Sequence, residues 1–263
     1  MTKPADVPAI SLPSGGRMPI VGFGTWKLRG HQAYSGCYQA LKAGYRHFDT
    51  ATMYGNEAEV GQALRDSGID RSELFVTTKI RPSDVGRERA VLTSSLRLLG
   101  TDYVDLWLVH WPPRRDEASR QMWAELLRLK ADGLARDVGV SNYSLGEIDD
   151  LIEDSGTAPA VNQVHWNPRR FDADVLAGHR ERGIELEGYS PLKDTKLDNR
   201  VLVDIASAHD VTPAQVVLRW HIEHDITVIP KSSQPDRIWA NIDLFGFSLT
   251  QQEVNRIDEM GDA

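Results

Sequence analysis

The sequence is poor in cysteine and has no block of basic residues. Cys37 is the only cysteine among the 263 residues, so no disulfide can form within the chain. It shares a helical face with Ala33, Ala40 and Leu41, a pattern typical of a packed side chain rather than a nucleophile. The formal net charge of −8, without a basic cluster, argues against a nucleic-acid partner.

Long apolar runs are also missing. No stretch approaches the roughly 20 apolar residues that cross a bilayer, and residues 1–10 have no apolar signal-peptide core. Together with the single cysteine, these absences predict a cytoplasmic protein that has no membrane partner.

Motifs for a metal site or a dinucleotide-binding sheet are absent or incomplete. There is no HExxH or CxxC, and His221 and His224, on one predicted helix, have no evident third ligand. We therefore expect two surface histidines and no metal site. Gly22 and Gly24 begin a GxGxxG motif, but Lys27 occupies its third glycine position. This departure argues against an open, doubly wound sheet.

The chain instead alternates strand-like and helix-like patterns. Short runs suited to strands buried on both faces occupy residues 20–24, 45–48, 74–78, 103–109, 135–140, 160–164, 184–187 and 226–229. Helical periods lie between them; Thr212, Pro213 and Gln215, for example, form a strong helix start. These eight units predict an α/β protein with one (β/α)8 TIM barrel domain over residues 1–263. A doubly wound sheet and, by length alone, two smaller domains are the alternatives.

A small hairpin is expected before the first unit. Residues 10–12 and 18–20 flank Ser14, Gly15 and Gly16, which is typical of two short strands joined by a tight turn. We expect this N-terminal β-hairpin to plug one end of the barrel.

The stretch around Asp49 and Tyr54 is the place where chemistry is expected. A buried-looking strand over residues 44–48 ends at Asp49, and Tyr54 follows five residues later. Asn56, with Glu59 three residues on, is expected to cap the next helix. Asp49 and Tyr54 would then lie in a strand-to-helix loop, where the active sites of α/β barrels are found.

Polar, aromatic or titratable residues stand at the end of nearly every predicted strand. The carboxyl ends of barrel strands share one rim, so these side chains should converge. Taken singly, Lys79 also fits a lysine that extends to solvent from a strand end, and His110 fits a hydrogen-bonded core histidine. The full set is Trp26, Asp49, Tyr54, Lys79, His110, Trp111, Ser141, Asn142, Gln163, Tyr189, Ser190 and Lys231.

Seven motifs, spread in order over the chain, resemble the aldo-keto reductase family. They are DTATMYGNE (49–57), TTK (77–79), LVHWP (108–112), GVSNY (139–143), VNQV (161–164), YSPL (189–192) and IPKS (229–232). The short form of the chain is similar to the bacterial branch that includes 2,5-diketo-D-gluconate reductases. The resemblance implies a (β/α)8 barrel that reduces aldehydes and ketones with NADPH.

The resemblance assigns the family's catalytic tetrad to Asp49, Tyr54, Lys79 and His110. Tyr54 would donate a proton to the carbonyl oxygen. The ordinary pKa of tyrosine, about 10, is high for this task, and the Lys79 ammonium, held by Asp49, would lower it. His110 would donate a hydrogen bond that orients the substrate oxygen.

The resemblance also implies the cofactor contacts. Ser141, Asn142 and Gln163 would bind the nicotinamide carboxamide, and Tyr189 would stack on the nicotinamide ring. The other expected contacts are Ser190 and Leu192 along the pyrophosphate, Lys231, Ser232 and Arg237 at the 2′-phosphate, and Asn241 at the adenine.

The residues themselves support a phosphate site in this last group. The segment from Lys231 to Arg237 runs from a predicted strand into a helix whose first turn holds Pro235. A helix N-terminus with Lys and Arg beside it suits a phosphate, which favours NADPH over NADH. A surface basic cluster is the alternative interpretation.

Two positions depart from the family pattern. Ala240 stands where the family often has a glutamate near the adenine, so a weaker hold on the cofactor is expected. His165 stands where a glutamate is common.

The substrate pocket is expected to be open and partly aromatic. Trp26 and Trp111 would line it beside Tyr54 and His110. The loops after the fourth and seventh strands are short, and most of the C-terminal tail that covers the pocket in longer relatives is missing. We therefore expect an enzyme that accepts small carbonyl compounds such as α-dicarbonyls or keto-sugars. Members of the family that the chain resembles are often monomers, so the resemblance also implies a monomer.

Two other functions fit parts of the pattern. A barrel aldolase would use Lys79 as a Schiff-base nucleophile, with Asp49 and Tyr54 as proton shuttles. A regulatory subunit would bind NADPH without turning it over.

Overall fold

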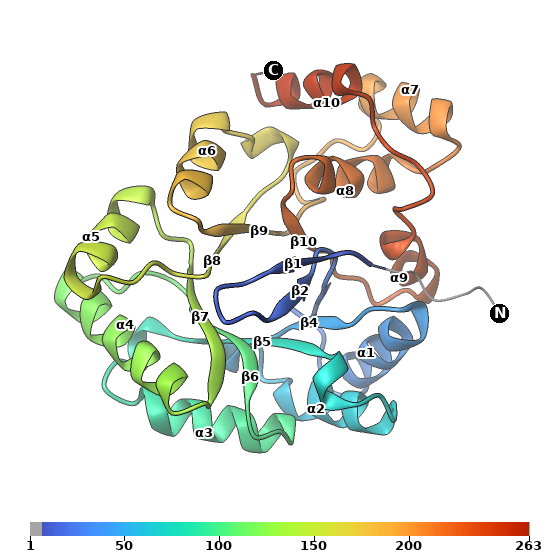
Figure 1. Cartoon of the computed structure of the whole chain (residues 1–263). Coiled ribbons are helices and arrows are strands. Elements are labelled where there is room, and N and C mark those ends of the chain that lie inside the picture. The colour runs from blue at the N-terminus through green and yellow to red at the C-terminus, as the bar shows by residue number, and fades with distance from the viewer. Residues whose placement is uncertain (1–6, 263) are drawn as a thin grey trace.

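Eight parallel strands form a barrel that helices surround (Figure 1). The computed structural model describes residues 7–262. The barrel strands are β3 (Phe23–Gly24), β4 (His47–Asp49), β5 (Phe75–Ile80), β6 (Val104–Val109), β7 (Ala135–Ser141), β8 (Val161–His165), β9 (Glu185–Tyr189) and β10 (Thr227–Ile229). The α-helices are α1 (His31–Ala43), α2 (Glu57–Asp66), α3 (Glu88–Leu99), α4 (Asp116–Ala131), α5 (Leu145–Ser155), α6 (Ala173–Glu181), α7 (Arg200–His209), α8 (Pro213–Glu223), α9 (Pro235–Ile242) and α10 (Gln251–Asp258).

The first and last strands meet, so the sheet closes on itself. Neighbouring strands pair in chain order from β3 to β10. The Gly22 amide donates to the Val228 carbonyl at 2.9 Å, and the Val228 amide donates to the Ile20 carbonyl at 2.9 Å. The predicted barrel is therefore confirmed, and the open-sheet alternative is wrong, because an open sheet would leave these two edges unpaired. All eight predicted strands are present, although the first is regular only over Phe23–Gly24.

The N-terminal hairpin covers the amino ends of the barrel strands, as predicted. Strand β1 (Ala9–Ser11) pairs antiparallel with β2 (Arg17–Pro19), and the hairpin crosses the centre of the ring in Figure 1. The completely buried Met18 packs with Phe75 and Val161, the first residues of β5 and β8. This apolar plug leaves the carboxyl ends of the strands as the accessible end.

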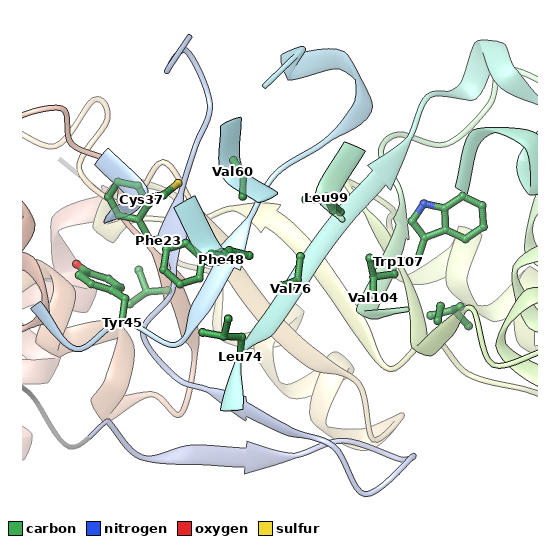
Figure 2. Packing of buried hydrophobic residues seen from close by; sticks show 14 of the residues in the cluster. Phe23, Cys37, Tyr45, Phe48, Val60, Leu74, Val76, Leu99, Val104 and Trp107 are labelled. Atoms are coloured by element: carbon green, nitrogen blue, oxygen red, sulfur yellow. The ribbon is translucent and has the colours of Figure 1, made fainter. Parts of the chain in front are cut away.

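A second apolar layer fills the space between the strands and the outer helices. Phe23 packs edge-on against Tyr45 and Phe48, with ring centroids 5.6 and 6.2 Å apart (Figure 2). Cys37 of α1 lies completely buried in the same cluster, beside Ala33. The predicted packing role of this cysteine is confirmed.

The predicted side-chain cap is present at the start of α8 and missing at the start of α2. Thr212 and Gln215 form the predicted capping box at the start of α8. Asn56 precedes α2, but its side chain caps no helical amide. It instead accepts a hydrogen bond from the Thr50 hydroxyl at 2.8 Å and donates to the Thr25 carbonyl at 3.0 Å. The predicted cap at Asn56 is therefore wrong, because its amide joins the loops after β3 and β4.

The two histidines near the end of α8 also differ from expectation. His221 is completely buried, and its Nδ1 atom lies 2.8 Å from the Val217 carbonyl, so the predicted surface position is wrong. His224 is half-buried and pairs with Asp258 of α10 at 2.8 Å. Within residues 7–262 no group of three His, Cys, Asp or Glu side chains is arranged to hold a metal.

No single helix in the described part of the chain is long and apolar enough to span a membrane. The bent pair of α7 and α8 passes that test jointly, by length and composition only.

Candidate active site

Four titratable side chains meet at the carboxyl ends of adjacent strands. Asp49 is the last residue of β4, Lys79 lies near the end of β5, and His110 directly follows β6. Tyr54 ends a short 3-10 turn, η1 (Thr52–Tyr54), that carries the chain back over the barrel. Strand pairing fixes the relative heights of β4, β5 and β6, and so brings these residues together.

A buried ion pair lies at the centre of this group. The Lys79 ammonium donates to both carboxylate oxygens of Asp49, at 2.7 and 2.6 Å, and to the Thr50 carbonyl at 3.0 Å. Lys79 is completely buried and Asp49 is 2% exposed. The alternative of a lysine that extends to solvent is therefore wrong. Burial lowers the pKa of Lys79, but attraction to Asp49 and Tyr54 outweighs it and raises the pKa above the ordinary value.

The Tyr54 hydroxyl lies close to the Lys79–Asp49 pair. The Lys79 ammonium lies 3.5 Å from the hydroxyl oxygen and 5.1 Å from the ring centroid. Burial raises the pKa of Tyr54 to about 12, against the lowering effect of the Lys79 charge. The expectation that Lys79 brings this pKa below its ordinary value is wrong, because desolvation outweighs the ammonium. Tyr54 is consequently a protonated phenol at neutral pH.

His110 is a neutral imidazole packed beside Tyr54. The two rings meet edge-on with centroids 5.7 Å apart, and Trp111 stacks on His110 at 4.0 Å. Burial lowers the pKa of His110 to about 2, and the charges of Lys79 and Arg81 act in the same direction. The Nδ1 atom of His110 is buried and has no partner among residues 7–262. His110 is therefore not the fully hydrogen-bonded core histidine of the alternative interpretation.

A hydrogen-bonded cluster connects the residues expected to hold nicotinamide. The Ser141 hydroxyl donates to the Gln163 carbonyl oxygen at 2.7 Å. The Asn142 amide nitrogen donates to the His110 carbonyl at 3.0 Å, and its oxygen accepts from the Tyr189 hydroxyl at 2.8 Å. Ser141 and Tyr189 are the last residues of their strands, and Asn142 directly follows Ser141. Their side chains therefore lie at the same rim of the barrel.

Gln163 has a second role that the sequence did not indicate. Its amide nitrogen donates to Asp49 Oδ2 and to Glu187 Oε2, both at 2.8 Å. Glu187 is completely buried and lies 3.5 Å from the equally buried His47. Sequence reasoning missed Glu187 and His47. Glu187 could have been noticed in the sequence, because it is a carboxylate in a predicted buried strand, two residues before Tyr189.

The acceptor atoms that remain suit a carboxamide. The side-chain oxygen of Gln163 accepts no hydrogen bond from residues 7–262, and the Asn142 oxygen has a second lone pair. The His165 ring stacks on the Tyr189 ring with centroids 5.4 Å apart. The histidine at this position, where the family commonly has a glutamate, therefore packs against Tyr189. The donor and acceptor set therefore fits a nicotinamide group.

The segment after β10 carries the expected phosphate ligands. Lys231 and Arg237 are exposed, and neither forms an ion pair with a residue in the range 7–262. Pro235 is the first residue of α9, as predicted, and Ser232 Oγ accepts from the Gln234 amide at 3.0 Å. Two free cations at a helix N-terminus fit a phosphate, although the same first turn also carries the acidic Asp236.

The other expected cofactor positions flank this segment. Asn241 is buried in the last turn of α9, next to the half-buried Ala240. Ser190 directly follows β9 with a left-handed backbone (φ 54°), and Leu192 is half-buried against the apolar core.

Two exposed tryptophans follow barrel strands at their carboxyl ends. Trp26 follows β3 and is 45% exposed; Trp111 follows β6 and is 39% exposed. A separate cavity of about 640 Å³ lies at the opposite end of the barrel strands, where Leu74 and Tyr103 precede β5 and β6. This cavity is not part of the active site.

Comparison with known proteins agrees with the fold. Residues 20–262 match the model of the "Aldo/keto reductase family". A 2,5-diketo-D-gluconic acid reductase B of Corynebacterium is 42% identical over 96% of this chain and 92% of its own. An aldo/keto reductase structure from Brucella melitensis superposes with a TM-score of 0.94 at 40% identity, covering 97% of this chain and 99% of that one. An aldo-keto reductase of Bombyx mori, in complex with NADP, gives a TM-score of 0.90 at 33% identity over 97% and 93% of the two chains. The chain therefore belongs to the aldo/keto reductase family of oxidoreductases.

Proposed function

We propose that this chain reduces small aldehydes and ketones, such as α-dicarbonyls or keto-sugars, to alcohols with NADPH. The observation that carries the proposal is the buried Lys79–Asp49 pair, whose ammonium lies 3.5 Å from the Tyr54 hydroxyl. A protonated phenol beside a fixed ammonium is suited to donating a proton to a carbonyl oxygen that becomes an alkoxide.

The reaction needs a hydride at the carbonyl carbon and a proton at its oxygen. Bound NADPH supplies the hydride. Tyr54 supplies the proton, and Lys79 stabilises the phenolate that remains. Asp49 holds the ammonium in place with both oxygens. His110, neutral at working pH, donates a hydrogen bond to the substrate oxygen and orients it.

The same rim residues hold the cofactor in this proposal. Gln163 and Asn142 accept hydrogen bonds from the carboxamide, with Ser141 holding both in place, and Tyr189 packs on the ring. Ser190 and Leu192 lie along the pyrophosphate. Lys231, Ser232 and Arg237 bind the 2′-phosphate, and Asn241 contacts the adenine. Two free cations support a preference for NADPH over NADH, whereas Ala240 removes an adenine contact and weakens the overall hold.

The exposed tryptophans support a broad substrate range. Trp111 stacks on His110, which packs against Tyr54, and Trp26 follows β3; both rings remain partly open to solvent. Such a rim gives small carbonyl compounds few specific contacts, so modest affinity for many of them is expected. The diketo acid reductase activity named for the Corynebacterium relative supports dicarbonyl acids as the first compounds to examine.

The charged state of Lys79 disfavours the aldolase alternative. A Schiff base forms from a neutral amine, whereas attraction to Asp49 and Tyr54 keeps the pKa of Lys79 above its ordinary value. The proposal also includes a monomeric enzyme, and the buried, free thiol of Cys37 supports a cytoplasmic location.

NADPH oxidation, followed by nicotinamide absorbance, tests the proposal. The panel contains small aldehydes, α-dicarbonyls and keto-sugars, each assayed with NADPH and with NADH. Turnover of several small carbonyls, faster with NADPH at low cofactor concentration, is expected. Tight NADPH binding without turnover of any carbonyl would favour the regulatory alternative, and no binding would overturn the cofactor assignment.

A further inference from the structure

A second carboxyl group lies inside the barrel beside the Lys79–Asp49 pair. Glu187 Oε2 accepts a hydrogen bond from the Gln163 amide nitrogen at 2.8 Å, and that nitrogen also donates to Asp49 Oδ2 at 2.8 Å. The amide nitrogen has two hydrogens, one for each carboxyl group. Gln163 therefore holds the two acids at a fixed spacing, and Glu187 is completely buried.

The other oxygen of Glu187 faces an acceptor. Glu187 Oε1 is buried, has no hydrogen-bond partner among residues 7–262, and lies 3.5 Å from His47 Nε2. His47 Nδ1 lies 3.1 Å from the Pro19 carbonyl oxygen, which can only accept. In a neutral imidazole the hydrogen is therefore on Nδ1, and Nε2 is an acceptor, with the Thr77 hydroxyl 3.4 Å away. Two facing buried acceptors are costly unless one of the pair carries a proton.

The surroundings favour a neutral pair with the proton on Glu187. Burial raises the pKa of Glu187 to about 8, and the Asp49 charge adds to this rise. Burial lowers the pKa of His47 to about 4. The other charged groups that act on Glu187 are Lys79 from β5, which lowers its pKa, and Glu185 from its own strand, which raises it. At neutral pH a protonated Glu187 can thus donate to His47 Nε2 and still accept from Gln163.

We propose that Glu187 is a positioning residue that carries a proton during carbonyl reduction, and that losing this proton to solvent at alkaline pH slows the reaction. This inference rests on the proposed function. While Glu187 is neutral, Asp49 is the only carboxylate among residues 7–262 that is paired with the Lys79 ammonium, whose field then also stabilises a phenolate on Tyr54. An ionised Glu187 adds a second negative charge close to that ammonium and opposes the phenolate.

Two variants separate the proton from the shape of the side chain. Glu187→Gln reproduces the neutral acid, because its amide can donate to His47 and accept from Gln163, but it cannot ionise. Glu187→Leu removes both hydrogen bonds. We expect kcat of the Gln variant at about pH 7 to stay within roughly threefold of wild type, and kcat of the Leu variant to fall by about tenfold or more.

The pH profile distinguishes a protonation role from a merely structural one. The alkaline fall of kcat should move upward by about one pH unit in Glu187→Gln, since the group that ionises near pH 8 is gone. Glu185→Gln is the matched control: it lies on the same strand and bonds Thr227 rather than Gln163. Because the Glu185 charge raises the pKa of Glu187, removing it should leave the alkaline fall in place or move it slightly downward, never upward. A Gln variant as slow as the Leu variant, or with an unshifted profile, would overturn the inference.

Infrared difference spectroscopy tests the proton without using activity. Wild type at about pH 6 should show a protonated-carboxyl C=O band that is missing in Glu187→Gln. If the band is present but no carbonyl is reduced, the proposed function fails and the protonated Glu187 stands. If the two spectra show the same carboxyl bands, Glu187 is ionised and the inference fails whatever the activity.

Discussion

Both carboxylate oxygens of Asp49 accept a hydrogen bond from the Lys79 ammonium, and neither side chain is more than 3% exposed. A buried pair of this kind is costly to break, because the remaining charge loses its partner in a medium of low dielectric. The pair is also the part of the site that determines how well a negative charge on Tyr54 is tolerated. Stability and catalysis are therefore coupled at this point of the barrel.

Replacing Asp49 by Asn should affect both properties. The neutral amide leaves the Lys79 charge uncompensated, so the free energy of unfolding should fall by about 3–5 kcal/mol, measured by urea denaturation. The rate of NADPH oxidation should fall by about tenfold or more, because the ammonium is no longer held beside Tyr54.

Asp137→Asn supplies the control for the Asp49 variant. Asp137 is also buried and pairs with Lys130 at 3.0 Å, but it is remote from Tyr54 at the hairpin end of the barrel, near Ser14. The Asp137→Asn variant should be less stable than wild type, while its kcat stays close to the wild-type value. Comparable losses of kcat in both variants would mean that the effect at Asp49 is only one of stability.

His110 should act as a hydrogen-bond donor and not as a titrating acid. Its pKa is lowered to about 2 by burial and by nearby cations, so its protonation state is constant over the whole working range. His110→Gln should lower kcat/KM by about 10- to 100-fold while leaving the shape of the pH profile unchanged. Loss of a titration limb between about pH 5 and pH 8 in this variant would show that His110 ionises during turnover.

The cofactor preference should depend on the two cations after β10. In the proposed binding mode, Lys231→Ala and Arg237→Ala each remove a charge-assisted contact to the 2′-phosphate, so the Kd for NADPH should rise by about tenfold in each variant. The Kd for NADH, measured by quenching of tryptophan fluorescence, is the internal control and should change little. Equal losses for both cofactors would mean that these residues do not distinguish them.

Glu187 should make the stability of the wild-type protein fall as pH rises. Its pKa is 4.5 in the unfolded reference and about 8 in the folded state, where burial and Asp49 raise it. Between these values the folded state binds more protons than the unfolded state, so stability is lost progressively with increasing pH. Thermal unfolding of wild type and Glu187→Gln should therefore diverge from about pH 5 to pH 8, the variant being relatively more stable at the alkaline end. If the melting temperatures of the two proteins changed with pH in parallel, the pKa of Glu187 would not be raised in the folded state.

The sequence was sufficient to predict the barrel because its signals are local. Aliphatic runs of strand length and the helix start at Thr212 each depend on a few neighbouring residues, and the structure confirms them. Asp49, Lys79 and His110 could be predicted as site residues for the same reason, because each is a titratable residue at or near the end of a predicted strand.

Contacts across the barrel interior could not be predicted in this way. His47 and Glu187 meet from opposite parts of the chain, and no periodic pattern links β4 to β9. The Asn56 side chain was assigned to its own helix because capping is a local pattern, whereas it binds Thr25 and Leu28. The pKa of Tyr54 was predicted from the Lys79 charge alone, because the depth of burial is visible only in three dimensions.

The central claim is that the Tyr54 hydroxyl supplies the proton for carbonyl reduction. Tyr54→Phe removes that oxygen and keeps the ring that packs on His110, and NADPH binding provides the control for an intact site. We predict a loss of kcat of about 100-fold or more, with the Kd for NADPH within roughly threefold of wild type. Full turnover by a Tyr54→Phe protein that binds NADPH normally would contradict the account.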